Sequence, residues 1–165
     1  MKKVLAILVI GVFLFGWLVC AYAKDAKMAY VDLDRVFEGY QKTKLAYKDL
    51  DNKLKNKEKK RKKMVDGIRR LKDEFELLSD KGKEEKQMAI DDRISSLNEF
   101  DRKAKDEFKK ERINAIRDIS NEIDIVIQGH GKKNDYDYIF SSRSLVFGRD
   151  AHDITKEILK ILNKK

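Results

Sequence analysis

The side chains that could do chemistry are few in this chain of 165 residues, and their types argue against catalysis. Asp32 and Asp34 resemble a pair of carboxylates for acid–base work, but their place after a short apolar run better suits a strand end and a helix cap. His130 lies between two glycines, where we expect an exposed loop, and His152 precedes Asp153, where we expect a helix start. With one cysteine, two histidines, no phosphate-binding loop and no nucleophile motif, the sequence predicts a protein that is not an enzyme and has no metal or cofactor site.

A dense basic run is the main candidate for binding. Residues 53–63 carry eight positive charges and one negative charge. The cations are Lys53, Lys55, Lys57, Lys59, Lys60, Arg61, Lys62 and Lys63. The run is either a solvated helix face or a surface that attracts an acidic partner over a long range, an attraction that salt would weaken. Lysines at core-type helix positions favour the second interpretation slightly, because they lower the stability of the helix packing.

The composition requires an extended architecture to carry these charges. Charged residues make up 41% of the chain and proline is absent, whereas about 25% charged is ordinary for a globular domain. Between residues 41 and 128, apolar side chains follow the 3,4 spacing that is typical of a coiled coil. The spacing runs through Tyr47, Leu50, Leu54, Lys57, Arg61, Met64, Ile68, Leu71, Phe75 and Leu78, then Ile90, Ile94, Leu97, Asp101, Ala104 and Phe108, and then Ile116, Ile119 and Ile123. Because Lys57 and Arg61 interrupt it, we expect a weak or solvated seam there.

A turn-like cluster at residues 79–83 divides this region into two helices, and Gly129-His130-Gly131 is expected to end the second. Two helices joined by a short turn run antiparallel. An outgoing helix of about 37 residues would project about 55 Å. The sequence therefore predicts a helical hairpin over residues 42–129, with its tip near 79–83.

Apolar residues outside the regular spacing form a second group of binding candidates. They are Val65, Leu77, Met88 and Phe100. They could contact segments of an unfolded partner, or they could form a second row of packing within the hairpin.

The two ends of the chain predict a small strand-containing body made from residues 24–41 and 130–165. At the N-terminal end a β-like run reaches Val31, and Asp34 is expected to cap a helical turn. At the C-terminal end we expect strands at 136–140 and 145–147. A terminal helix with an apolar stripe follows, and Asp153 is expected to cap it.

Three short strands and about two short helices bury too little surface for a stable unit. Copies of the same chain are the simplest source of the missing strands and apolar area, so we expect oligomerisation. The candidate contact residues of this oligomerisation body are Tyr30, Val31, Leu33, Val36, Phe37, Tyr138, Phe140, Val146, Phe147, Ile154 and Ile158.

The first 23 residues have the layout of a secretory signal peptide. Two lysines precede an apolar run, and Ala21-Tyr22-Ala23 forms a small-x-small site, so we expect cleavage after Ala23. An uncleaved anchor and a lipid on Cys20 remain alternatives. The whole chain carries a net charge of +9, and removal of the two leading lysines leaves +7. Export would place this charge near lipopolysaccharide, anionic membrane surfaces and acidic polypeptides, and it disfavours nucleic acid as a partner.

Residues 28–37 (MAYVDLDRVF), the charged hairpin, residues 136–139 (YDYI) and residues 153–160 (DITKEILK) together resemble the Skp (OmpH-like) family of periplasmic chaperones. The resemblance covers essentially the whole mature chain and is most specific at the two ends. It implies an α+β, mostly α fold in a homotrimer, with a β-barrel body made from three chains and three helical tentacles. It also implies binding of unfolded outer-membrane proteins between the tentacles without ATP, and lipopolysaccharide binding in some members.

Two other classes of protein remain open at this point. One is a polyanion-binding protein, for lipopolysaccharide or nucleic acid, which would use the same basic run. The other is a structural spacer in the cell envelope, held by a retained anchor or by a lipid on Cys20.

Overall fold

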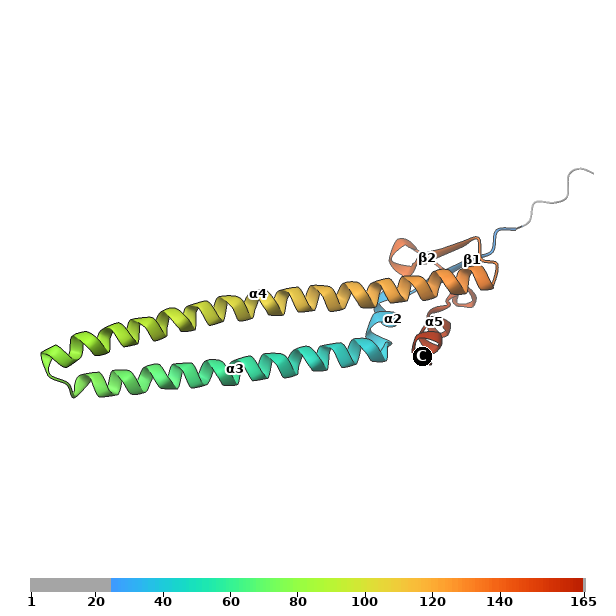
Figure 1. The fold of residues 1–165 in the computed structure, drawn as a ribbon. Coiled ribbons are helices and arrows are strands. Elements are labelled where there is room, and N and C mark those ends of the chain that lie inside the picture. Colours follow the sequence, from blue (N-terminus) through green and yellow to red (C-terminus); the bar gives the residue numbers. More distant parts are fainter. Residues whose placement is uncertain (1–24, 165) are drawn as a thin grey trace, which may run out of the picture.

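The computed structural model describes residues 25–164 as a long helical hairpin with a small body at its open end (Figure 1). Helix α3 (Gln41–Glu76) has 36 residues and α4 (Asp80–Lys133) has 54, which at 1.5 Å per residue correspond to about 54 and 81 Å. Because α4 is longer, its last turns continue past the start of α3 into the body. The predicted α+β, mostly α architecture with a long antiparallel hairpin is confirmed. The expected signal peptide lies outside the described residues.

The turn at the tip is short. Helix α3 ends at Glu76, and Ser79 takes the N-cap position of α4. Residues 77–79 therefore form the turn, while residues 80–83 already belong to the first turn of α4. Asp80 lies in that first turn, where a negative charge is favourable near the positive end of the helix dipole.

The expected end of α4 at Gly129-His130-Gly131 is wrong. The helix continues to Lys133, and the chain leaves it through Asp135, which has a left-handed φ of 54°. A Cβ atom on Gly131 would lie 3.0 Å from Cδ1 of Ile139, so this glycine allows the body to pack closely on the helix. This packing outweighs the low helix propensity of glycine, about 1 kcal/mol relative to alanine.

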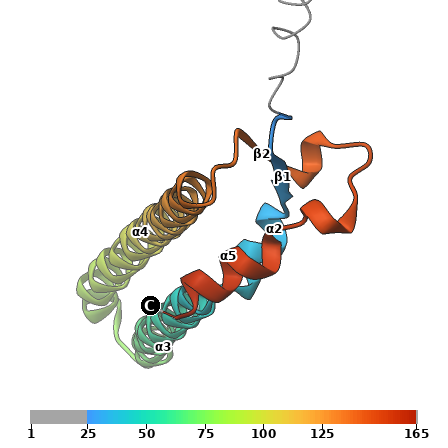
Figure 2. The same cartoon turned by 90° about the vertical axis from the view of Figure 1, so that its right-hand side faces the viewer.

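The body contains β1 (Met28–Val31), α2 (Leu33–Gly39), β2 (Tyr138–Ser141) and α5 (Thr155–Leu162). Strands β1 and β2 pair in parallel, with Met28 opposite Tyr138 and Val31 opposite Ser141. Figure 2 shows α5 beside α2 at the base of the hairpin, with the two strands above them.

The expected strand at residues 145–147 is wrong. These residues lie in a loop between two short 3-10 helices, Ser142–Ser144 and Asp150–His152. Val146 and Phe147 are 107% and 82% exposed, so neither packs against a sheet within the described chain. An alternating apolar pattern becomes a strand only when another backbone is available to pair with it.

The cap of α2 is Asp32 and not Asp34. Oδ1 of Asp32 accepts a hydrogen bond from the backbone N–H of Arg35 at 3.0 Å. Asp34 lies in the first turn and accepts hydrogen bonds of 2.8 and 2.6 Å from the guanidinium group of Arg143. At α5, Oδ1 of Asp153 accepts the backbone N–H of Thr155 at 2.9 Å, although the N-cap position itself is Ile154, one residue later than expected.

One chain closes a core of its own at the base of the hairpin. The buried residues are Ala29, Val31, Val36, Tyr40, Ile119, Ile123, Val126, Ile154, Ile158 and Leu162. The two ends alone have too little apolar area, and the sequence predicts that other copies of the chain provide the rest. The base of α4 supplies part of it within the same chain. Four of the candidate oligomer contacts, Val31, Val36, Ile154 and Ile158, are core residues of the single chain.

Candidate binding surfaces of the body and the arms

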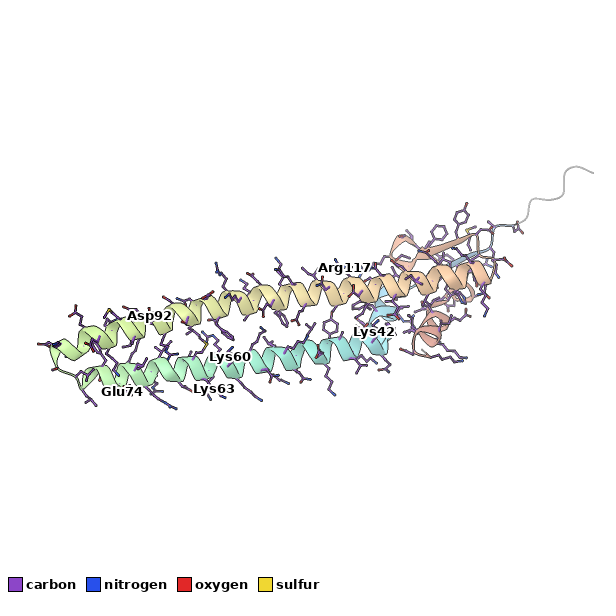
Figure 3. The ribbon with its side chains drawn as sticks, viewed as in Figure 1. Lys42, Lys60, Lys63, Glu74, Asp92 and Arg117 are labelled. Carbon is purple, nitrogen blue, oxygen red and sulfur yellow. The ribbon has the colours of Figure 1, made fainter. Side chains whose placement is uncertain are left out.

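Ion pairs cross between α3 and α4 along the arms, many of whose side chains are charged (Figure 3). The cross-arm pairs are Lys42–Glu122, Lys53–Glu111, Lys57–Glu107, Arg61–Asp101 and Lys86–Glu74, with N–O distances of 2.5 to 3.0 Å. The basic residues Lys57 and Arg61, which interrupt the apolar spacing, therefore face carboxylates of α4. The sequence spacing finds Asp101 as a seam position but does not identify its partner.

Two pKa shifts follow from these pairs. A hydrogen bond from Lys57 lowers the pKa of Glu107 below its ordinary value, and the nearby charge of Lys57 acts in the same direction. Hydrogen bonds to Glu111 and then to Asp49 raise the pKa of Lys53. Lys57 is half-buried and the other groups are exposed, so solvent screens the pairs and each contributes little to stability.

The ion pairs occupy only part of the basic run. Lys53, Lys57 and Arg61 pair across the arms, and Lys55 pairs with Asp51 on its own helix at 2.7 Å. The other four cations, Lys59, Lys60, Lys62 and Lys63, make no ion pair with the described residues. The Nζ atom of Lys60 lies 5.3 Å from the ring centroid of Phe100. About half of the run thus remains available to an external anion.

A groove of about 460 Å³ lies on the tip-side half of the arms, and we call it the arm groove. Its lining residues are Lys60, Lys63, Met64, Gly67, Arg70, Leu71 and Glu74 of α3 and Arg93 of α4. Figure 3 labels Lys60, Lys63 and Glu74, which follow one another along α3 toward the tip. The basic run predicted from the sequence includes Lys60 and Lys63 of this groove but not Gly67, Arg70 and Arg93. The lining residues on α3 recur at intervals of three and four between residues 60 and 74. This spacing places them on one face of the helix, so it could have identified them from the sequence.

The apolar binding candidates of the arms are spread from the middle of the hairpin to its tip. Leu77, in the tip turn, is 87% exposed, and Met88 on α4 is 60% exposed. Val65 is 38% exposed, and Phe100 is half-buried beneath Lys60. Three of the four are therefore accessible to a partner along the arms.

The body carries an exposed apolar surface that we call the body surface. Tyr138 and Phe140 of β2 are 59% and 38% exposed, and Val146 and Phe147 of the following loop project into solvent. The rings of Tyr138 and Phe140 stack with centroids 6.0 Å apart. Parallel sheets are normally covered on both faces, and stable isolated sheets need three or more strands. Asp153 bridges the outer edge of β1 at Tyr30, so within residues 25–164 the sheet leaves the outer edge of β2 and its apolar side chains as a candidate surface for a further chain.

The two histidines lie in structured surroundings, and the expectation of an exposed loop for His130 is wrong. Its side chain is 12% exposed on α4, stacks on Tyr136, and has Nε2 3.2 Å from Oε2 of Glu157 on α5. His152 ends the short 3-10 helix Asp150–His152 just before α5. Within residues 25–164, no group of three or more histidine, cysteine or acidic side chains is arranged to hold a metal ion. No helix of the described chain is both long and apolar enough to cross a membrane.

The fold and these surfaces define a class of protein with a small strand-bearing body, a long helical hairpin and exposed binding surfaces on both. The family model described as outer membrane protein (OmpH-like) matches residues 27–162. The chain belongs to the OmpH-like family.

Solved structures agree at the level of the fold. The chain is similar to a protein from Caulobacter crescentus CB15 that is assigned as an OmpH-like outer membrane chaperone, with a TM-score of 0.78 and 10% sequence identity. The match covers 84% of this chain and 85% of that protein. A search of curated protein sequences finds no match to the chain.

Proposed function

We propose that the processed chain is an ATP-independent holdase chaperone of the periplasm that binds unfolded outer-membrane proteins and prevents their aggregation. The observation that carries this proposal is membership of the OmpH-like family over nearly the whole chain, together with the extended charged arms. The structural match to a protein assigned as an outer membrane chaperone supports the same role.

The arms suit the capture of an unfolded chain by many weak contacts. Helix α3 has 14 basic and 7 acidic residues, a net charge of +7, whereas α4 has 13 of each and is neutral. A positive α3 attracts acidic segments over a distance set by the ionic strength. Exposed apolar residues such as Leu77 and Met88 add short-range contacts without forming a unique pocket.

The body surface suits self-association, and we propose a homotrimer joined through it. An apolar surface next to the outer edge of β2 is formed by Tyr138, Phe140, Val146 and Phe147. Covering this surface with sister chains would complete the sheet and leave the arms free around a central space in which a client binds.

Aggregation of a client tests the chaperone role. A β-barrel outer-membrane protein is diluted from urea with and without the chain that begins at Lys24. We expect suppression of light scattering at a molar excess of trimer without nucleotide. Undiminished scattering at that excess would overturn the holdase proposal.

Sedimentation equilibrium tests the assembly. The mature chain is expected to have the mass of three copies, and Val146→Asp with Phe147→Asp is expected to reduce it to that of one copy with unchanged helical circular dichroism. Val65→Asp with Leu77→Asp, which adds the same charge to the arms, should leave the mass unchanged. A wild-type monomer would contradict the trimer proposal.

Export is tested by cell fractionation and by mass spectrometry of the purified protein. A free N-terminus at Lys24 in the periplasmic fraction supports the proposal. A lipid on Cys20 or an intact leader would instead support the envelope spacer.

A further inference from the structure

We propose that the arm groove is a docking site for short extended segments of unfolded polypeptide that carry an acidic side chain next to apolar ones. This inference rests on the proposed chaperone function and names the kind of client segment that the arms select. It is carried by the charge of the groove, by the glycine at its centre and by its length.

The rims of the groove carry positive charge that the rest of the described chain does not neutralise. Lys63, Arg70 and Arg93 make no ion pair with a residue in the range 25–164. The single carboxylate in the lining, that of Glu74, is 2.6 Å from Nζ of Lys86. The cross-arm ion pairs nearest the groove occur at its two ends, at Arg61 and at Glu74, and neither of them involves the cations between these ends. An acidic side chain would therefore complement the groove.

Gly67 keeps the groove open at its centre. A Cβ atom at this position would meet no atom within 4 Å, and the backbone has no positive φ that would favour glycine. Glycine inside a helix is destabilising relative to alanine. At Gly131 a larger side chain would crowd Ile139, but at Gly67 no neighbouring atom of the described chain requires glycine. Its effect is to leave space between the half-buried side chains of Met64 and Leu71.

The dimensions of the groove match an extended peptide. From Lys60 to Glu74 the helix rises about 21 Å, which is the length of about six residues of β-strand. Strands of outer-membrane barrels alternate apolar and polar side chains. In such a segment an apolar side chain can contact Met64 and Leu71 while a neighbouring acidic side chain reaches the cations of the rim.

Peptide binding tests the charge of the groove. The probe is a fluorescent eight-residue peptide of alternating leucine and glutamate, and its control has glutamine in place of glutamate. We expect the wild-type chain to bind the glutamate peptide more tightly, and Lys63→Glu with Arg70→Glu to weaken this binding about tenfold. The matched control is Lys105→Glu with Arg112→Glu, which makes the same two changes at the same spacing on α4, outside the groove. It should change the affinity by less than about twofold, because only long-range attraction is altered.

Filling the groove tests its shape. Gly67→Leu is expected to reduce affinity for the glutamate peptide while the thermal unfolding temperature stays the same or rises, because leucine is a better helix former than glycine. Unchanged peptide binding by Gly67→Leu would overturn the proposal. So would equal effects of the two charge-reversed variants.

Two further outcomes separate this inference from its alternatives. If phosphatidylglycerol vesicles bind the wild-type chain but not Lys63→Glu with Arg70→Glu, and the peptide does not bind, the groove takes an anionic amphiphile and the proposal is overturned. If the wild-type chain suppresses client aggregation and the groove variant does so equally well, the holdase function stands and the groove proposal fails. Tight peptide binding with no suppression would support the groove and contradict the holdase.

Discussion

The body and the arms are stabilised in different ways. The body holds ten buried apolar residues, contributed by β1, α2, the base of α4, α5, and the residues Tyr40 and Ile154 that flank helices. Along the rest of the hairpin, the described chain buries three large apolar side chains, Leu50, Ile68 and Ile90, and adds exposed ion pairs between the helices.

One small chain thus combines a closely packed body with arms that can adapt their shape. A buried core tolerates few changes, because close-packed side chains lose contacts when any one is shortened. A thin seam with solvated ion pairs tolerates many changes and can deform at little cost. The body is thus suited to setting the position of the arms, and the arms are suited to contacting partners of variable shape.

The largest expected effect is a cavity in the body. Ile158 is 0% exposed, so Ile158→Ala should lower the free energy of unfolding by about 2–5 kcal/mol. Leu50→Ala in the arms is the comparison, and its loss should be smaller because the two helices can close around the gap. Urea unfolding followed by circular dichroism measures both. Equal losses would contradict the contrast between the two regions.

A smaller effect is expected at the start of α5. The carboxylate of Asp153 accepts hydrogen bonds from the backbone N–H and the hydroxyl of Thr155, and that hydroxyl also accepts the N–H of Asp32 at 2.9 Å. Asp153→Ala should lower the free energy of unfolding by about 1 kcal/mol. Asp153→Asn keeps an acceptor and should retain most of this stability in the same urea experiment. A loss as large for asparagine as for alanine would show that charge, and not the cap hydrogen bond, matters there.

Two glycines in the same helical hairpin should respond in opposite directions. Gly67→Ala adds a methyl group in open space and should raise stability by about 0.5–1 kcal/mol. Gly131→Ala places a Cβ atom 3.0 Å from Ile139 and should lower stability. Thermal unfolding of the two variants makes the comparison, and a rise for both would show that the body packs on α4 more loosely than the structure indicates.

The smallest effect concerns the pH dependence of the arms. The pKa of Glu107 lies below its ordinary 4.5 because of the hydrogen bond from Lys57, and that of Glu99 is lowered by Lys103. A lowered pKa in the folded chain means that the pair stabilises the fold above about pH 4.5 and that this stability is lost as the pH falls through the lowered value. The difference in thermal unfolding temperature between pH 7 and pH 3 should therefore be slightly smaller for Glu107→Gln than for the wild type. If the variant and the wild type have the same pH dependence, the ion pair between Lys57 and Glu107 does not contribute to the stability of the arms.

Local patterns predict the hairpin and its approximate length, because 3,4 spacing over many turns has few interpretations. They do not predict which side chains face each other. Lys57 and Arg61 appear as defects of the seam until the antiparallel register places Glu107 and Asp101 opposite them. The arm groove is missed for the same reason, since Arg93 joins the α3 residues only after α4 folds back.

The chain ends show the same division. Local spacing and turn residues predict that two long charged helices form an antiparallel pair and that short apolar segments lie at both ends, because these signals act over a few neighbouring residues. Contacts in the folded chain account for the rest: α4 continues through Gly131, His130 lies against Tyr136 and Glu157, and residues 145–147 are a loop and not a strand. These outcomes depend on contacts between segments far apart in the chain, where the packing of Ile139 on α4, and the presence or absence of a partner backbone, outweighs local preference.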